Sequence, residues 1–352
     1  MKILITGIAG FVGSQLAGYF KKNIANCEII GIDNLIRRGS ETNLPLLKSL
    51  GCQFFYGDIR LKEDVEELPK VDWVVDCAAN PSVLAGINGG TSQLVSHNLQ
   101  GTLHILEKCR KDQAGFVLLS TSRVYSIDAL NKIPLIEGAT RFTVNPAAAL
   151  PDGFNSNGVT ESFSTAAPVS LYGATKLASE VMALEYASTF GFPIWVNRCG
   201  VIAGAGQFGK IDQGIFSFWI YQWLLERPLG FIGFGGKGKQ VRDFFNPEDL
   251  GNLLVKQMKN PSHNAPKIIN AGGGLKSAMS LLELNDYCKQ QFGFDKPIKT
   301  ESTTRPFDLP YYVTDNSQVK KFWDWEPQQS AIQVLEEIVE YAKDNREKLL
   351  TL

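Results

Sequence analysis

The spacing of Tyr172 and Lys176 is the strongest chemical signal in the sequence. Residues four apart on a helix lie on one face, so we expect the phenol and the ammonium side by side. The ordinary pKa of tyrosine is about 10, and lowering it by about 3 units requires about 4 kcal/mol of added phenolate stabilisation. A close ammonium contributes to that stabilisation. The pair therefore predicts a general acid and base for a hydroxyl, although ordinary exposed helices also show this spacing.

A further hydroxyl is expected beside this pair. Ser120 and Thr121 stand at the end of an apolar run that predicts a strand over residues 117–120. Either side chain would hydrogen-bond the oxygen of a substrate whose proton Tyr172 exchanges.

Three glycines near the start of the chain predict a phosphate site. Gly7, Gly10 and Gly13 follow a strand-like run, Phe11 and Val12 lie between the last two glycines, and a helix follows. Glycines there let the backbone turn tightly and approach a pyrophosphate, which the helix N-terminus stabilises. A plain tight turn is the alternative reading.

The position of Asp33 favours a dinucleotide site over a plain tight turn. It ends the second predicted strand about twenty residues after the glycines, where a carboxylate accepts hydrogen bonds from ribose hydroxyls. The same charge repels a 2′-phosphate, so the sequence favours NAD over NADP, with Arg37 and Arg38 as counter-evidence.

Two later strand ends also carry candidate cofactor contacts. Asp58, next to Ile59, is placed to hydrogen-bond an adenine amino group, and Ala78 and Ala79 are small enough for backbone to pass near a cofactor. Each is equally compatible with a simple turn at a strand end.

Alternating apolar and amphipathic segments predict how these residues are positioned. Strands are expected at 3–6, 29–32, 54–56, 73–76, 117–120 and 194–197, and the clearest helices at 93–110 and 172–189. This order is typical of an α/β doubly wound parallel sheet. We expect a first domain over 1–198 with returning segments near 240–272, and a smaller α/β lobe over 199–239 and 273–352.

Residues 126–170 interrupt that rhythm. They are rich in Ala, Pro, Asn, Gly and Thr, and predict a long surface loop, either functional or a tolerated insertion. Helices are expected again at 247–259, 280–291 and 331–347.

Composition excludes several classes of function. A net charge of -1 without a basic run argues against nucleic-acid binding, and no apolar stretch is long enough to predict a membrane span. The six cysteines form no C-x-x-C pair and only three histidines occur, so neither a disulfide framework nor a metal site is expected. The three histidines are predicted to be satisfied structural residues, and the default location is cytoplasmic.

The arrangement resembles the extended short-chain dehydrogenases/reductases, the NAD-dependent epimerase/dehydratase family, whose fold is the NAD-binding Rossmann fold. The matching motifs span nearly the whole chain: Thr6-Gly7-x-x-Gly10-x-x-Gly13, Asp33-Asn34-Leu35, Gly57-Asp58, Asn98-x-x-Gly101-Thr102, Ser120-Thr121-x-x-Val124-Tyr125, Tyr172-x-x-x-Lys176, Arg198 and Arg242-Asp243.

The resemblance implies roles for these positions. Tyr172 would be the acid/base, Lys176 its tuner and a nicotinamide-ribose ligand, and Thr121 the hydroxyl partner of the substrate. Arg242 and Arg305 would bind the diphosphate of a nucleotide sugar, since guanidinium groups suit phosphate oxygens, with surface salt bridges as the alternative. The remaining implied contacts are Asn34 and Asn98 for the cofactor, and Arg123 and Gln207 for the substrate.

Some stretches resemble the CDP-tyvelose (CDP-paratose) 2-epimerases more closely. They are Asp33 to Gly39, Glu137 to Thr143, Gly206-Gln207-Phe208 leading to Asp212-Gln213-Gly214, and Gly238 to Asp243. The chain departs from the wider family at Asp76, where many relatives have His, and at Ser126, where Gly is usual. The loop from Pro151 to Ser170 looks longer than in the 2-epimerases and is expected to border the sugar.

The residues after Thr121 discriminate among reactions. Related dehydratases carry Asp-Glu there for eliminating water, whereas this chain has Ser122-Arg123. The resemblance therefore favours an epimerase of a nucleotide-diphosphate sugar, with CDP-hexose and inversion at C2 preferred. A 4-epimerase, a net reductase and a non-catalytic dinucleotide-binding protein stay open as alternatives, and a homodimer or homotetramer built on the two long helices is expected.

Overall fold

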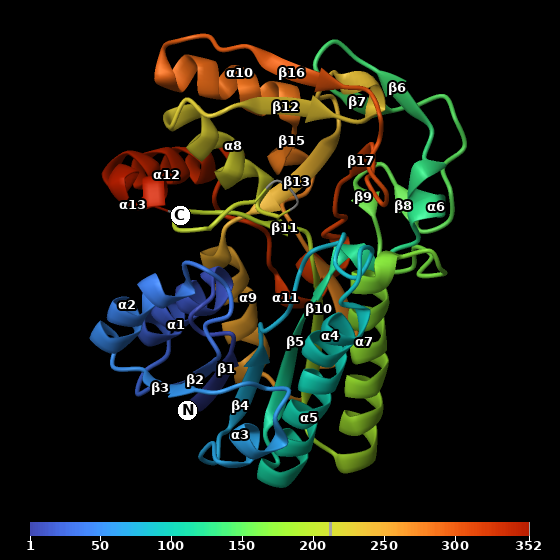
Figure 1. Ribbon diagram of the computed structural model, residues 1–352. Coiled ribbons are helices and arrows are strands. Elements are labelled where there is room, and N and C mark those ends of the chain that lie inside the picture. Colours follow the sequence, from blue (N-terminus) through green and yellow to red (C-terminus); the bar gives the residue numbers. More distant parts are fainter. Residues whose placement is uncertain (211–212, 352) are drawn as a thin grey trace.

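The computed structural model describes residues 1–210 and 213–351. Asp212, part of a stretch that resembles the 2-epimerases, lies outside the described residues. The main body of the chain is an α/β unit with a second lobe above the carboxyl edge of its sheet (Figure 1).

The large sheet has seven parallel strands in the order β14-β10-β5-β4-β1-β2-β3, which confirms the predicted doubly wound fold. The strand order reverses between β1 and β4, where such sheets bind ligands at their carboxyl ends. The strands are β1 (Lys2–Thr6), β2 (Glu28–Asp33), β3 (Gln53–Tyr56), β4 (Trp73–Asp76), β5 (Gly115–Thr121), β10 (Ile194–Cys199) and β14 (Ile268–Ala271).

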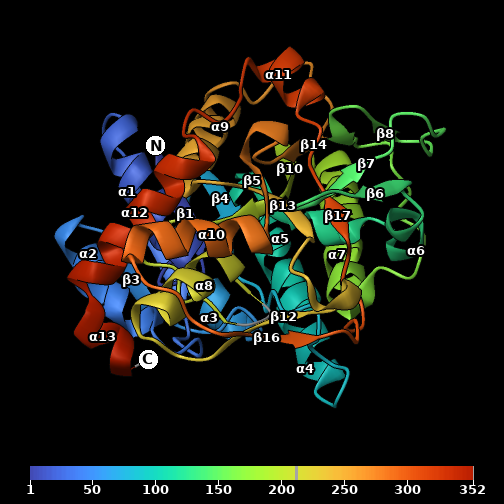
Figure 2. The same cartoon turned by 90° about the horizontal axis from the view of Figure 1, so that it is seen from above.

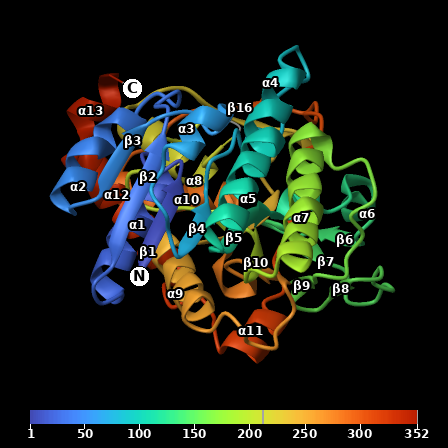
Figure 3. The same ribbon diagram turned by 90° about the horizontal axis from the view of Figure 1, so that it is seen from below.

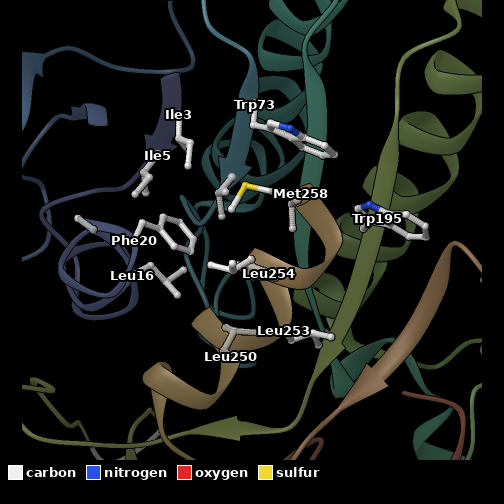
Figure 4. Close-up of a cluster of buried hydrophobic side chains, with 14 of the residues drawn as sticks. Ile3, Ile5, Leu16, Phe20, Trp73, Trp195, Leu250, Leu253, Leu254 and Met258 are labelled. Carbon is white, nitrogen blue, oxygen red and sulfur yellow. The ribbon is translucent and has the colours of Figure 1, made fainter. Parts of the chain in front are cut away.

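Helices cover both faces of this sheet because its strands are apolar on both sides. On one face α1 (Phe11–Asn23) and α9 (Pro247–Lys259) direct side chains such as Phe20 and Leu254 toward β1 (Figure 4). Asn246 caps α9 by accepting a hydrogen bond from the Glu248 N–H at 2.8 Å. That face also carries α2 (Leu44–Ser49) and α11 (Ser317–Trp323).

The opposite face is covered by α3 (Lys62–Glu66), α5 (Gly101–Asp112) and α7 (Ser170–Phe190). The long helices α5 and α7 lie side by side (Figures 1 and 3). Before α5 the chain forms α4 (Thr91–Val95) and a π-helical turn, η2 (Ser96–Gln100).

The second lobe consists of two small sheets and four helices, seen from above in Figure 2. In one sheet β13 (Val241–Phe245) pairs with β11 (Val201–Ile202), β15 (Ala278–Ser280) and β17 (Tyr311–Tyr312). In the other, β12 (Leu229–Ile232) pairs with β16 (Ile298–Glu301). The helices are α8 (Ile215–Leu224), α10 (Leu281–Phe292), α12 (Ala331–Asp344) and α13 (Arg346–Thr351).

One helix boundary differs from the sequence-based prediction, and one strand was not predicted. The helix expected over 331–347 is divided after Asp344, and its start is fixed by a capping box of Ser330 and Gln333. Strand β14 joins the large sheet from the segment near 240–272, while the domain limits themselves stay a prediction.

Residues 126–170 are more ordered than their composition suggests, and they do not border the cavity. They form α6 (Ile127–Asn131), the hairpin β6–β7 (Leu135–Glu137 and Phe142–Val144) and the hairpin β8–β9 (Phe154–Asn155 and Gly158–Val159). Phe163 and Val159 are buried against residues 311–313, and the Val159 N–H donates to the Val313 carbonyl at 2.8 Å. These apolar side chains hold the segment on the far side of the second lobe, which corrects the expectation that it borders the sugar.

Short 3₁₀ turns complete the described chain: η1 (Ser40–Asn43), η3 (Ser122–Val124), η4 (Phe234–Gly236) and η5 (Leu275–Ser277). None of the helices in the described ranges is long and apolar enough to cross a membrane.

Candidate active site

A cavity of about 1030 Å³ lies between the carboxyl ends of the large sheet and the second lobe. One wall consists of the ends of β1, β2, β4 and β5, and the opposite wall comes from α8, β12 and β13. Its position at the reversal of strand order is where a doubly wound sheet is expected to bind a dinucleotide.

The glycine turn forms the floor of this cavity. Gly7 has φ +64°, and a Cβ atom on Gly13 would lie 2.4 Å from the Gly7 carbonyl oxygen. Only glycine therefore allows α1 to begin so close to β1. Gly7, Gly10, Phe11, Val12 and Gly13 all line the cavity, so the backbone N–H groups at the start of α1 are placed to receive a pyrophosphate.

The Asp33 carboxylate lies at the end of β2 and lines the cavity. It accepts hydrogen bonds from the backbone N–H groups of Ala9, at 3.0 Å, and Leu35, at 2.8 Å. Burial raises its pKa, and these backbone bonds oppose that effect. Arg37 donates instead to the Gln213 side chain and, at 3.0 Å, to the Phe208 carbonyl, and so connects this end of the cavity to the second lobe.

Asp58 and Ile59 line the cavity beside Asn34. Asp58 accepts a hydrogen bond from Asn34 at 2.8 Å and pairs with Arg60 at 2.6 Å, and the Arg60 hydrogen bond holds the pKa of Asp58 well below its usual range. On the side of the pocket predicted to hold adenine, the Asp58 carboxylate is therefore paired with the Arg60 guanidinium.

Ala78 and Ala79 line the cavity after β4. The Thr6 hydroxyl fixes this stretch by accepting from the Ala78 N–H at 3.0 Å while it donates to Asp76 at 2.5 Å. Asn98 does not line the cavity. Its side chain is buried behind this stretch and accepts a hydrogen bond from the Asn80 N–H at 2.7 Å.

Thr121 and Tyr172 meet at the centre of the cavity. Gly173 permits this approach, because a Cβ atom there would lie 2.2 Å from the Arg123 carbonyl oxygen. Burial raises the pKa of Tyr172 to about 12, whereas hydrogen bonding by Thr121 and the Arg123 charge act in the opposite direction. Desolvation is the larger of these effects, so a positive charge close to the phenol would favour the action of Tyr172 as a base.

Lys176 and Ser120 lie behind this surface rather than in it. Burial lowers the pKa of Lys176, and the Asp76 carboxylate opposes that effect most strongly. Ser120 donates to Glu180 at 2.5 Å, and Glu180 in turn pairs with Arg198 at 2.7 Å. Of the two neighbouring hydroxyls, only that of Thr121 belongs to the cavity wall.

Arginines gather at the end of the cavity away from Asp58. Arg242 donates to Asp308 at 3.0 Å and to the Leu309 carbonyl at 2.7 Å, and burial lowers its pKa to about 10. Arg123 donates to the Phe307 carbonyl at 3.0 Å, and Arg305 lines the same end. Guanidinium groups donate in a planar fork, so this end suits a polyanion such as a diphosphate.

Gln207 also lines the cavity, but its side chain is engaged locally. It donates to the Ile202 carbonyl at 3.0 Å and accepts from the Ser217 hydroxyl at 3.0 Å. Its amide therefore shapes the wall where the second lobe begins.

His97 is a cavity residue that the sequence analysis missed. The prediction of satisfied structural histidines is confirmed for His104 and His263, each within 2.8 Å of a carbonyl oxygen. It is wrong for His97, whose two ring nitrogens are buried with no hydrogen-bond partner among the described residues. No sequence pattern indicated the π-helical turn that carries this ring. Among the same residues, no group of three or more His, Cys, Asp or Glu is placed to hold a metal ion.

Comparisons with known proteins agree with this geometry. Residues 3–272 match the model of the NAD dependent epimerase/dehydratase family. The CDP-paratose 2-epimerase of Salmonella typhi is 32% identical over 94% of this chain and 96% of its own. The UDP-glucuronate 4-epimerase of Thermodesulfobacterium geofontis is 27% identical over 99% and 98%.

A solved structure shows the same fold. The UDP-glucuronic acid 4-epimerase of Bacillus cereus, in complex with UDP-glucuronic acid and NAD, superposes with a TM-score of 0.80. It is 28% identical, and the match covers 98% of this chain and 99% of that one. The chain is an enzyme that belongs to the NAD-dependent epimerase/dehydratase family, and NAD is its cofactor.

Proposed function

We propose that this enzyme epimerises a nucleotide-diphosphate sugar, with a CDP-hexose as substrate and C2 as the inverted carbon. The observation that carries the proposal is the content of the cavity next to Thr121. Ser122 and Arg123 line it there, so a hydroxyl and a guanidinium occupy positions where a dehydratase needs two carboxyl groups to eliminate water. Oxidation and re-reduction at one carbon require only the Tyr172 and Thr121 hydroxyls beside the cofactor.

Each residue has a defined task in this proposal. Tyr172 accepts the proton of the sugar hydroxyl as the ketone forms and returns it when the hydroxyl is restored, and Thr121 hydrogen-bonds the same oxygen. NAD, held by the glycine turn, Asp33 and the Ala78 stretch, would supply the acceptor and the donor for the hydrogen on that carbon. Lys176 is buried behind the wall, where the Asp76 charge favours its ammonium form, and it places positive charge near Tyr172.

The other end of the cavity holds the nucleotide diphosphate. Arg242 and Arg305 bind its phosphate oxygens, and Arg123 faces the sugar. Asp308 pairs with Arg242 at 3.0 Å and orients its guanidinium group.

The choice of CDP and C2 rests on the relative from Salmonella typhi. Inversion at C4 is the second candidate, because the 4-epimerases of Thermodesulfobacterium geofontis and Bacillus cereus match almost the entire chain.

A substrate screen tests the proposal and separates the two candidates. Thermal-shift measurements with CDP-, UDP-, GDP- and dTDP-hexoses identify the nucleotide, and NMR of the incubated mixture identifies the carbon. We expect interconversion of two CDP-hexoses differing at C2 without added NAD. Stoichiometric formation of NADH, or a dehydrated product, would overturn the epimerase assignment.

We also propose that the enzyme is a homodimer or homotetramer built on α5 and α7. Helix α7 exposes the apolar side chains of Leu171, Val181 and Phe190, with 54% of the Val181 surface accessible. Light scattering should give two or four times the chain mass, whereas a monomer would contradict this arrangement.

A further inference from the structure

His97 occupies an unusual position beside the cofactor end of the cavity. It lies on η2, a π-helical turn between α4 and α5, and its half-buried ring lines the cavity together with Asp58, Ile59 and Gln93. Single π-helical turns occur frequently at functional sites.

The ring nitrogens of His97 distinguish it from the other two histidines. Both nitrogens are buried, and neither has a hydrogen-bond partner among the described residues. His104 and His263, by contrast, each reach a backbone carbonyl. A buried polar group without a partner costs free energy, so an unpartnered ring in a cavity wall indicates a ligand that supplies the missing bonds.

The surroundings favour the neutral form of this ring. Burial lowers the pKa of His97 and the Arg60 charge lowers it further, while Asp58 and the nearby Gln93 carbonyl oppose them. Helix α4 contains no charged residue, and α7 places the uncharged hydroxyls of Thr175 and Ser179 beside Asn98. A neutral imidazole offers one donor and one acceptor.

We propose that neutral His97 hydrogen-bonds the adenosine half of NAD and thereby couples retention of the cofactor to pH. Adenosine is uncharged and carries both donors and acceptors on its base and ribose, which matches the two functions of the ring. Ala78 and Ala79 and the glycine turn hold the remainder of the dinucleotide, so His97 adds a contact that the motifs do not encode. The inference rests on the cofactor and not on the identity of the sugar.

Solvation of the His97 ring determines how the affinity for NAD changes with pH. Bound NAD excludes water from the ring and uses its acceptor nitrogen, so binding lowers the pKa of His97 further. Affinity for NAD must therefore fall as the pH decreases through the pKa of His97 in the free protein. Asp58 does not contribute to this change, because its pKa lies far below that range.

Isothermal titration of the NAD-free full-length protein tests the inference, with NAD as the probe at about pH 5.5 and about pH 8. The wild type should bind more weakly at the lower pH. His97→Phe should weaken binding at the higher pH by about tenfold and show a smaller pH dependence, with His97→Asn between the two. His263→Phe, on a ring that contacts the Phe322 carbonyl, is the matched control and should behave like the wild type.

Nitrogen-15 NMR of the wild-type imidazoles checks the same point without a variant. The His97 signals should remain those of a neutral ring to lower pH when NAD is bound. Equal affinities of His97→Phe and wild type, or tighter wild-type binding at low pH, would overturn the inference and leave the epimerase proposal intact. Failure of the wild type to bind NAD at either pH would instead remove the cofactor site itself.

Discussion

The two halves of the cavity are built in different ways. The cofactor half consists of consecutive strand ends of one sheet, from Gly7 after β1 and Asp33 on β2 to Asp58 after β3 and Ala78 after β4. The sugar half takes Arg123, Gln207, Arg242 and Arg305 from segments far apart in the chain. Sheet geometry therefore positions the first half, whereas the second half combines Arg123, which follows β5 of the large sheet, with residues positioned by the packing of the second lobe.

We expect changes in the two halves to have different consequences. A change in the cofactor half disturbs the junction of β1 and α1, on which the sheet depends. A change in the sugar half disturbs loops that the second lobe holds, and it leaves the sheet unaltered.

Tyr172→Phe should cause the largest loss of activity, because it removes the hydroxyl that exchanges the proton of the sugar in the proposed mechanism. We expect turnover of the nucleotide sugar to fall by roughly 10²- to 10⁴-fold. The affinity for NAD should stay near that of the wild type, measured by titration calorimetry. Activity retained within tenfold would assign the acid and base to another residue.

Phe163→Ala tests whether the 126–170 segment supports the sugar half from behind. Phe163 is 2% exposed, so its removal should lower the free energy of unfolding by about 3 to 5 kcal/mol, measured with urea. The affinity for NAD should not change. Phe190→Ala, at a ring that is 39% exposed, should cost clearly less.

Gly13→Ala tests the junction in the cofactor half. Its Cβ atom would lie 2.4 Å from the Gly7 carbonyl, so we expect a loss of roughly 1 to 3 kcal/mol of stability together with weaker binding of NAD. The matched change in the same helix is Gly18→Ala, whose nearest atom is 3.9 Å away on Leu50. It should stabilise the protein by up to about 1 kcal/mol, because alanine has the higher helix propensity. Equal melting temperatures for the two variants would contradict this assignment.

Arg242→Lys should have the smallest effect of the four and should be confined to the sugar half. A lysine cannot reproduce the planar fork, so binding of CDP should weaken by about tenfold. Binding of NAD should be unaffected. Arg227→Lys, at an arginine that contacts the Leu350 carbonyl on the outside of the lobe, should leave both affinities unchanged.

The sequence predicts which residues line the cofactor half of the cavity, because each of them belongs to a short motif at a strand end, while their contacts with NAD stay a prediction. The glycine turn, Asp33, Asp58, Ala78 and Ala79 all line the cavity as expected. Periodicity also locates six of the seven strands of the large sheet and both long helices, since fully apolar runs are distinctive.

Three predicted site residues are placed differently, for reasons that only packing reveals. Lys176, Ser120 and Asn98 stand next to cavity residues in sequence but turn toward Asp76, Glu180 and Asn80. The sequence motif shows that these residues lie close to the cavity. Whether a side chain lines the cavity or is buried behind its wall depends on the packing around it.

The packing of the segment 126–170 and the position of the His97 ring could not be predicted from the sequence. The β8–β9 hairpin is held by the backbone of Val313, more than 150 residues away in the chain. The orientation of the His97 ring depends on one π-helical turn, which does not alter the hydrophobic pattern.

The origin of the hydrogen on the inverted carbon tests the central claim most directly. The enzyme is incubated with its nucleotide-sugar substrate in D₂O, and the epimer is analysed by NMR and mass spectrometry. If Tyr172 handles only the hydroxyl proton while the carbon-bound hydrogen is removed and returned within the closed cavity, the product carries no deuterium at that carbon. Full incorporation of deuterium there would mean that the carbon is deprotonated and reprotonated by solvent, and would contradict the account.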